Sequence, residues 1–164
     1  MTDPAHSTAF VPTNLSTFFA IASESLKRME VLKESGKRPK PDGEPGWIIS
    51  YDPDQKSFKE ALATIVFSGI YLEALLHLLI VKEHGLSVFK KYDRKKTDAD
   101  KLSLLGCTDA SIINACNHFK VVRKEIVHEK AHLDSKIIRY AQDEAAKSFK
   151  LIQSINTHFG IANG

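Results

Sequence analysis

Cysteine is scarce in this 164-residue chain, which contains only Cys107 and Cys116. Neither lies in a C-x-x-C motif or beside a Cys/His cluster, so they indicate neither a disulfide scaffold nor a cysteine-based metal site. We expect both to be reduced thiols packed inside a cytoplasmic protein. Long runs of alternating β-branched residues are also missing, and the sequence therefore does not predict a sheet of any size.

A large excess of charge of one sign is missing as well. The chain has 23 Lys and Arg against 20 Asp and Glu, a formal net charge of +3. Residues 1–82 hold 9 basic against 10 acidic residues, whereas residues 83–164 hold 14 against 10. This tilt permits an anionic partner for the second half without requiring one.

The sequence predicts neither a signal peptide nor a membrane span. Residues 1–12 lack a basic start and a long apolar stretch, so we expect a flexible N-terminal tail. Residues 61–81 are apolar enough to suggest a membrane helix, but Glu73 and His77 near their centre would be costly in lipid. We therefore expect a buried helix and no membrane contact.

Apolar residues recur every three or four positions in four long stretches, which is typical of helices that face a core. Two shorter stretches also favour helix. The predicted long helices cover residues 14–34, 57–84, 108–129 and 135–159, and the predicted short ones cover residues 86–91 and 98–105. The expected fold is all-α, a single domain over residues 13–160 built as an up-and-down bundle of four main helices plus one or two short helices.

Specific residues predict where these helices begin and how they are connected. Ser57 and Glu60 form an S-x-x-E capping box at the start of the second long helix, Thr108 is expected to cap the third, and Asp134 or Ser135 the last. A long loop at residues 36–54, rich in Pro and Gly, joins the first two long helices. We expect Trp47, Ile48, Ile49 and Tyr51 to attach this loop to the core.

Two chemically different motifs share His128 in the stretch RKEIVHEKAH, residues 123–132. The first is H-E-x-x-H, formed by His128, Glu129 and His132, in which two imidazoles hold Zn²⁺ and the glutamate acts as base. Its surroundings do not favour zinc: Lys130 places a cation between the ligands, and no third ligand follows in a recognisable pattern. We expect no metal and no cofactor.

The second motif is Arg123 followed five residues later by His128. Metal-independent RNA cleavage needs a proton donor and acceptor near neutral pH, which histidine provides, and a cation for the phosphate, which arginine provides. Positions i and i+5 lie about 140° apart around a helix, so the pair shares no face within one chain. A two-fold dimer would bring two such pairs into one cleft.

The stretch VVRKEIVHEK near the end of a late helix in an all-α chain resembles the R-x(4–6)-H signature of HEPN domains. The apolar stretch FSGIYLEALLHLLI is similar to the family's second core helix. The resemblance implies a dimeric helical bundle and, in many members, a metal-independent endoribonuclease of toxin–antitoxin or defence systems. It makes Arg123 and His128 the catalytic residues and places Glu73 at the family's acidic position, where it can also serve as a buried acid bonded to His77 or Arg123.

The chain departs from the family pattern at two positions. Lys124 stands where a small polar residue usually follows the arginine, and Lys130 stands where members paired with a nucleotidyltransferase antitoxin often carry tyrosine. Lys120 and Lys124 are expected to guide the RNA backbone.

The leading hypothesis is a homodimeric HEPN-type endoribonuclease in the cytoplasm that cuts RNA and has a possible cognate antitoxin protein. The alternatives are a catalytically inactive HEPN-like dimerisation or RNA-binding module, and a small zinc hydrolase that uses HEKAH.

Overall fold

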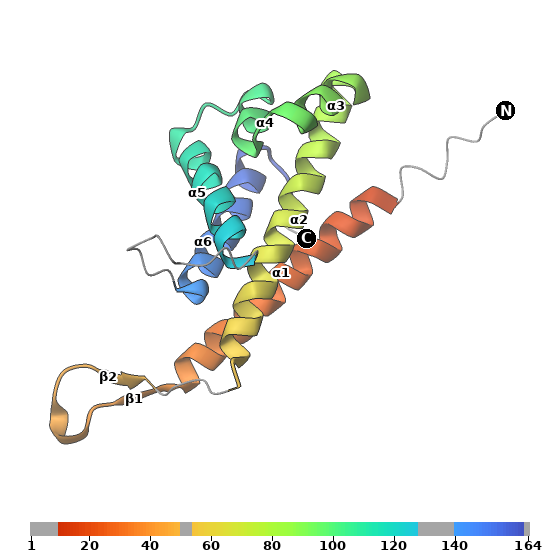
Figure 1. The fold of residues 1–164 in the computed structure, drawn as a ribbon. Helices are drawn as coiled ribbons and strands as arrows, with labels where there is room; N and C mark the ends of the chain where they lie inside the picture. Colours follow the sequence, from red (N-terminus) through yellow and green to blue (C-terminus); the bar gives the residue numbers. More distant parts are fainter. Residues whose placement is uncertain (1–9, 50–53, 128–139, 163–164) are drawn as a thin grey trace.

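The structure, a computed structural model, describes residues 10–49, 54–127 and 140–162, and these ranges are mostly helical (Figure 1). The predicted all-α class is confirmed. The described helices and strands are α1 Phe10–Ser35, β1 Lys37–Pro39, the 3-10 turn η2 Pro41–Gly43, β2 Trp47–Ile49, α2 Lys56–His84, α3 Leu86–Lys95, α4 Asp98–Leu104, α5 Ala110–Val127 and α6 Ala141–His158.

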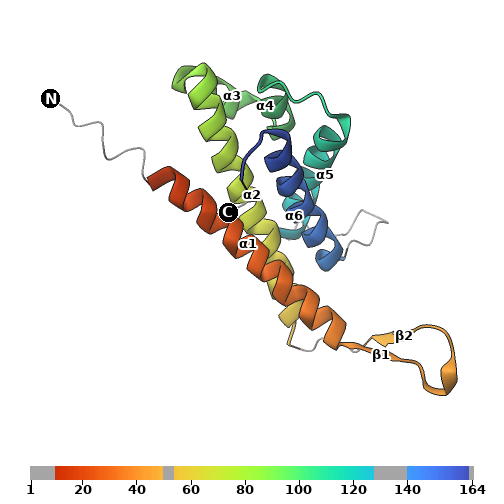
Figure 2. The same ribbon diagram turned by 180° about the vertical axis from the view of Figure 1, so that it is seen from behind.

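Helices α1 and α2 form a long antiparallel pair, and the other helices lie on one side of it (Figures 1 and 2). Helix α6 packs against α2 and, less extensively, against α1, and α5 packs on α6. The short helices α3 and α4 lie near the end of α2 where α2 finishes. The strands β1 and β2 form a small hairpin that projects from the opposite end of the pair.

The core follows the apolar spacing that the sequence predicts. On α5, the stripe Ile112, Cys116, Phe119 and Val122 is buried. The corresponding stripes of α1 and α6 are also largely buried, and α2 contributes the largest share of the core: Ala61, Ile65, Tyr71, Leu72, Leu75, Leu76 and Ile80. Burying these side chains is the main favourable term that holds the helices together.

Helix α2 is the one described helix that is long and apolar enough to cross a membrane. Half of its most apolar stretch is buried inside the fold. The Tyr71 hydroxyl at its centre donates a 2.7 Å hydrogen bond to Asn156 Oδ1 of α6, and both residues are buried. Because a core helix also combines high hydropathy with buried contacts, the composition of α2 does not by itself indicate a membrane span.

Several helix starts differ from the sequence-based prediction. The capping box predicted at Ser57 and Glu60 is wrong, because α2 begins earlier, after Gln55, and Gln55 makes no side-chain cap. Ser57 Oγ instead accepts a hydrogen bond from Gln142 of α6, and Glu60 pairs with Arg28 of α1. Contacts with other helices thus take the place of the predicted capping box within α2.

The caps of the later helices also differ. Asp109, and not Thr108, caps α5, since its carboxylate accepts hydrogen bonds from the backbone N–H groups of Ser111 and Ile112. Helix α6 begins at Ala141, and the predicted caps Asp134 and Ser135 lie outside the described residues.

The predicted loop at residues 36–54 contains the hairpin, with β1 and β2 antiparallel and Pro39 opposite Trp47. Trp47 does not attach the loop to the core, because 63% of it is exposed. Helix α1 begins at Phe10, inside the segment predicted as a tail, and residues 1–9 lie outside the described part of the chain. Proline is tolerated in a first helical turn, where its missing N–H would have no partner, and Pro12 occupies such a position.

Candidate functional site

A groove of about 340 Å³ lies where the end of α5 meets α2 and the junction of α3 and α4. We call it the Arg123 groove. Its lining comes from three parts of the sequence that the fold brings together: Glu73 of α2, Lys96, Thr97 and Asp98 at the α3–α4 junction, and Phe119, Lys120, Arg123 and Lys124 of α5. Four of the residues predicted from the sequence therefore line one groove.

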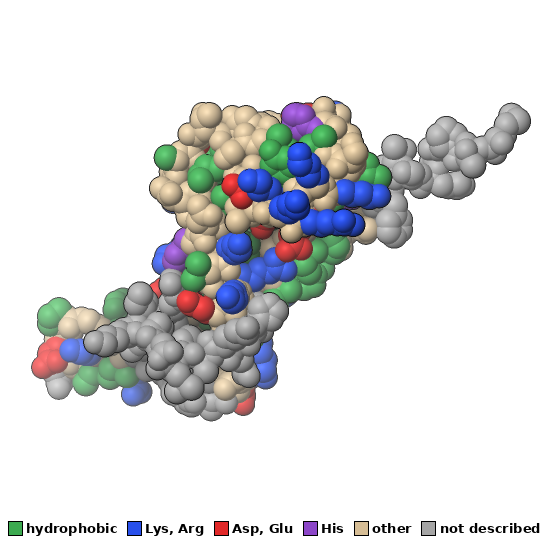
Figure 3. All heavy atoms as spheres, turned by 45° about the horizontal axis from the view of Figure 1, so that its top comes forward, with side chains coloured by type: hydrophobic (Ala, Val, Ile, Leu, Met, Phe, Trp, Pro, Cys, Tyr) green, Lys and Arg blue, Asp and Glu red, His purple; other side chains and the backbone are tan. Residues whose placement is uncertain are grey.

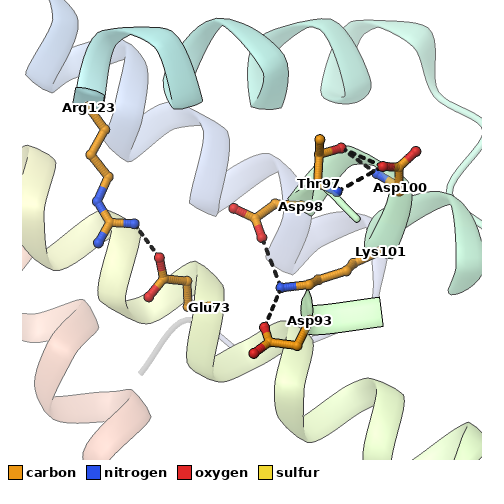
Figure 4. Close-up of polar contacts among 7 residues, drawn as sticks. All are labelled: Glu73, Asp93, Thr97, Asp98, Asp100, Lys101 and Arg123. Atoms are coloured by element: carbon orange, nitrogen blue, oxygen red, sulfur yellow. Dashed lines mark hydrogen bonds and ion pairs between the residues drawn. The ribbon is translucent and has the colours of Figure 1, made fainter. Parts of the chain in front are cut away.

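Arg123 extends from α5 across to α2, where its Nη1 donates a hydrogen bond to Glu73 Oε1 (Figure 4). The two side chains are 29% and 52% exposed, respectively. The expectation that Glu73 bonds to Arg123 is thus confirmed, and the expectation that Glu73 is buried is wrong. An ion pair this accessible to water contributes little to stability. Its main effect is to define where the guanidinium lies.

Gly69 allows this arrangement and was not recognised from the sequence. A Cβ atom placed on Gly69 would lie 2.8 Å from both Cζ and Nε of Arg123. The arginine therefore lies directly over the α2 backbone, one helical turn before Glu73. A glycine inside a helix costs about 0.5–1 kcal/mol relative to alanine. A glycine in the middle of the most apolar helix was the available signal that another group approaches there.

The spacing of Lys120, Arg123 and Lys124 places them on one face of α5, since residues three and four apart are neighbours on a helix. Lys120 and Lys124 are exposed, and both line the groove beside Arg123. Val127 is the last described residue of α5. His128, the second predicted catalytic residue, follows it directly in the sequence and lies outside the described residues.

The other wall of the groove is held by polar contacts at the α3–α4 junction (Figure 4). Thr97 and Asp100 form a capping box, with Asp100 N donating to Thr97 Oγ1 at 3.1 Å and Thr97 N donating to Asp100 Oδ2 at 2.8 Å. The Asp100 carboxylate accepts hydrogen bonds from both the backbone N–H and the hydroxyl of Thr97, and these two bonds lower its pKa. The box fixes the start of α4 and the backbone beside Lys96.

Lys101, a nearly buried residue of α4, links α3 to the start of α4. Its side chain is 7% exposed, and Nζ donates to Asp93 Oδ1 at 2.9 Å and to Asp98 Oδ1 at 3.3 Å. Burial lowers the pKa of Lys101, but the hydrogen bonds and charges of the two aspartates outweigh burial and raise it overall. Asp98 is held by this contact, although it lines the groove.

Basic side chains extend from the groove onto α3. Figure 3 shows Lys and Arg gathered on the face that carries α3 and the end of α5. The exposed basic residues of this face, which we call the basic face, are Lys90, Lys91, Arg94, Lys95 and Lys96 together with Lys120 and Lys124. A surface of this kind attracts polyanions and raises their local concentration.

Within the described residues, no three His, Cys, Asp or Glu side chains are close enough to hold a metal ion. His128, Glu129 and His132, on which the zinc interpretation rests, lie outside those residues. What the described groove offers is three lysines and one arginine around two carboxylates, Glu73 and Asp98, each of which is already paired with a basic side chain. Groups of this kind can bind phosphate oxygens directly.

Comparison with known proteins yields no family model, no curated protein and no solved structure that matches the chain.

Proposed function

We propose that the protein is a metal-independent endoribonuclease of the HEPN type and acts as a homodimer whose composite site is built from Arg123 and His128. The observation that supports this best is the Arg123 groove. It gathers Lys120, Arg123 and Lys124 of α5 with Lys96 of the α3–α4 junction, and the last described residue of α5, Val127, directly precedes His128 in the sequence. The proposal includes an up-and-down arrangement of the four long helices, a cytoplasmic location, and a defence or toxin role with a possible cognate antitoxin protein.

In this proposal each residue has a separate task. Arg123 binds the non-bridging oxygens of the scissile phosphate and stabilises the charge that develops there. Lys120 and Lys124 bind neighbouring phosphates and set the register of the strand. His128 removes the proton from the 2′-hydroxyl, and the His128 of the second copy protonates the leaving oxygen. The dimer supplies this second imidazole.

Glu73 has a supporting role in the free protein. It holds the guanidinium of Arg123 across α2, and a phosphate must compete with its carboxylate for the same N–H groups. Because the pair is open to water, the exchange costs little. Replacing Glu73 with Gln should therefore tighten RNA binding, whereas cleavage should fall if the carboxylate also sets the orientation of Arg123.

A second function is supported by the same contact. Arg123 is already paired, and Lys124 follows it where a small polar residue is usual in the family. These two features favour a catalytically inactive module that binds RNA on the basic face. Salt-dependent affinity without cleavage is the expected behaviour of such a module.

The test measures cleavage of single-stranded RNA in the presence of EDTA. Wild type, His128→Ala and Arg123→Ala are compared with Arg28→Ala as a matched control. Arg28 also joins its helix to α2 through a glutamate, with Nε 3.0 Å from Glu60 Oε1, but it belongs to α1 and not to the groove. We expect cleavage by wild type and Arg28→Ala, and a loss of at least about a hundredfold in the other two.

Equal cleavage by wild type and His128→Ala would remove the catalytic assignment. RNA binding that requires Arg123 but occurs without cleavage would establish the second function instead. Sedimentation of wild type as a monomer at the concentration of the assay would contradict the composite site.

A further inference from the structure

A second groove, of about 500 Å³, runs between α5 and α6 and takes no part in the function proposed above. Its volume falls in the range of small-molecule sites. Several of its lining residues have small side chains, which leave space between the two helices: Ser111 and Ala115 on α5, and Ser148 and Ser154 on α6. We call it the α5–α6 groove.

The floor of this groove is apolar. Ile112 and Phe119 of α5 and Leu151 of α6 line it, and each is at most 6% exposed. An apolar floor in an open groove favours a ligand with a compact apolar or aromatic body, because binding removes both surfaces from water.

The edge of the groove is polar and is organised around Glu144. This residue is 4% exposed, and its carboxylate accepts hydrogen bonds from His118 Nε2 at 2.6 Å and from Lys147 Nζ at 2.8 Å. Burial raises the pKa of Glu144, but the bonds from Lys147 and His118 outweigh burial and lower it. The carboxylate is thus ionised at neutral pH and can only accept, so Nε2 of His118 carries a proton.

Cationic groups outnumber the carboxylate at this edge. Lys147 alone balances the charge of Glu144. Lys150, one turn further along α6, also lines the groove and is exposed, and no acidic partner of Lys150 occurs among the described residues. His118 is 39% exposed, and its Nε2–H is already donated to Glu144, so Lys150 and the remaining donors of Lys147 are the groups left for an anion. A buried charge is costly unless it is paired. Pairing with the buried Glu144 carboxylate explains why Lys147 is here, but it does not explain the additional positive charge of Lys150.

We propose that the α5–α6 groove is a binding site for a small organic anion that carries one phosphate or carboxylate on a compact apolar or aromatic body. The body lies on Ile112, Phe119 and Leu151, and the anionic group binds Lys150 and the free donors of Lys147. Mononucleotides, aryl phosphates and short fatty acids share this chemistry. The cations of this groove differ from those of the Arg123 groove, so the proposal stands or falls independently of RNA cleavage.

Isothermal titration calorimetry on the full chain tests the proposal with three anionic probes, adenosine 5′-monophosphate, phenyl phosphate and octanoate. Adenosine and inorganic phosphate serve as probes that lack the charge or the body. At least one anionic probe is expected to bind more tightly than both, and which one binds identifies the source of the ligand. The proposal is overturned if none binds with a Kd below about 1 mM.

Two variants locate the binding. Ala115→Leu fills the groove from an exposed helical position, and its matched control is Ala146→Leu, at an exposed position of α6 outside the groove. Lys150→Gln removes the surplus charge, and Lys27→Gln on α1 is its control. We expect Ala115→Leu and Lys150→Gln each to weaken binding by about tenfold or more, and the controls to leave it unchanged.

Circular dichroism confirms that each variant is folded. Unchanged affinity in folded Ala115→Leu would place the ligand elsewhere and overturn the site. Unchanged affinity in Lys150→Gln, with adenosine binding as well as its phosphate, would overturn the assignment of an anion.

Discussion

Among single residues, Gly69 has the most specific role, because it determines whether Arg123 can lie across α2. Replacing glycine with alanine inside a helix usually stabilises a protein by about 1 kcal/mol. We predict that Gly69→Ala raises the free energy of unfolding by less than this, since the new Cβ displaces the arginine. In an Arg123→Ala background the obstacle is absent, and the same substitution should show the full gain. Urea denaturation of the four proteins measures the difference as a double-mutant cycle.

The affinity of the protein for RNA should fall in Gly69→Ala, although its stability does not. The reason is that the new Cβ displaces the Arg123 guanidinium from the place where it would meet a phosphate. An equal gain of stability in both backgrounds would mean that Gly69 does not act through Arg123.

The contribution of Glu144 to stability should depend on pH. Its pKa in the folded protein lies below the ordinary 4.5, so its contribution to stability is present above about pH 4.5 and is lost as pH falls through the folded value. Glu144→Gln should be less stable than wild type at pH 7, and the difference should shrink towards pH 3. Urea denaturation followed by circular dichroism across about pH 3–7 checks this.

Asp100 and Asp109 also have lowered pKa values, because Thr97 and Ser111 hydrogen-bond to their carboxylates. Because these two carboxylates are still present in Glu144→Gln, this variant should also lose some stability as the pH falls. A difference between the two proteins that stays constant with pH would contradict the ionised, paired state of Glu144.

Local spacing explains which residues could be predicted. Lys120, Arg123 and Lys124 lie three and four positions apart on a strongly patterned helix, and their shared face follows from helix geometry. The contact between His118 and Glu144 joins residues 26 apart on two helices. Such a contact depends on how α5 and α6 are placed against each other, which no local pattern specifies.

Between elements, Lys101 is the contact that joins α3 to α4. Lys101→Met keeps most of the side-chain volume but removes the bonds to Asp93 and Asp98. We expect a loss of about 1–3 kcal/mol in the free energy of unfolding. Lys95→Met, at an exposed position near the end of α3, is the matched control and should change stability by less than about 0.5 kcal/mol.

An unchanged free energy of unfolding in Lys101→Met would show that apolar packing alone holds the junction. The ring of Phe89, 5.7 Å from Lys101 Nζ, would then be the main partner of this side chain.

The elements themselves were largely predictable, and their ends were less so. Apolar periodicity predicted the four long helices among the described residues, and the two shorter stretches that favoured helix correspond to α3 and α4. The start of α2 was mispredicted because Ser57 and Glu60 bond to α6 and α1 and not to their own helix. Tertiary contacts override local capping signals in this way.

For the whole molecule, the location of the basic face leads to a prediction about salt. Four cationic side chains line the Arg123 groove, from Lys96 to Lys124. Each phosphate contact on single-stranded RNA contributes a slope of about −0.7 to the logarithm of affinity against the logarithm of salt concentration. We therefore expect a slope of up to about −3 for wild type.

Lys120→Ala and Lys124→Ala should each reduce that slope by about 0.7, whereas Arg28→Ala should leave it unchanged. Fluorescence anisotropy of labelled RNA at several salt concentrations measures these slopes. A slope that remains the same in a Lys120→Ala, Lys124→Ala double variant would place RNA on another surface.

The position of the hairpin has a spectroscopic consequence. Trp47 is the only tryptophan of the chain, and it lies on β2, 63% exposed, at the end of the α1–α2 pair away from α3 and α4 (Figure 2). Its indole is therefore expected to emit as a water-exposed fluorophore in the folded protein. Emission from Trp47 will change little when the helices separate, and ligands in either groove will leave it almost unaffected, so the tryptophan fluorescence of this protein reports on its hairpin.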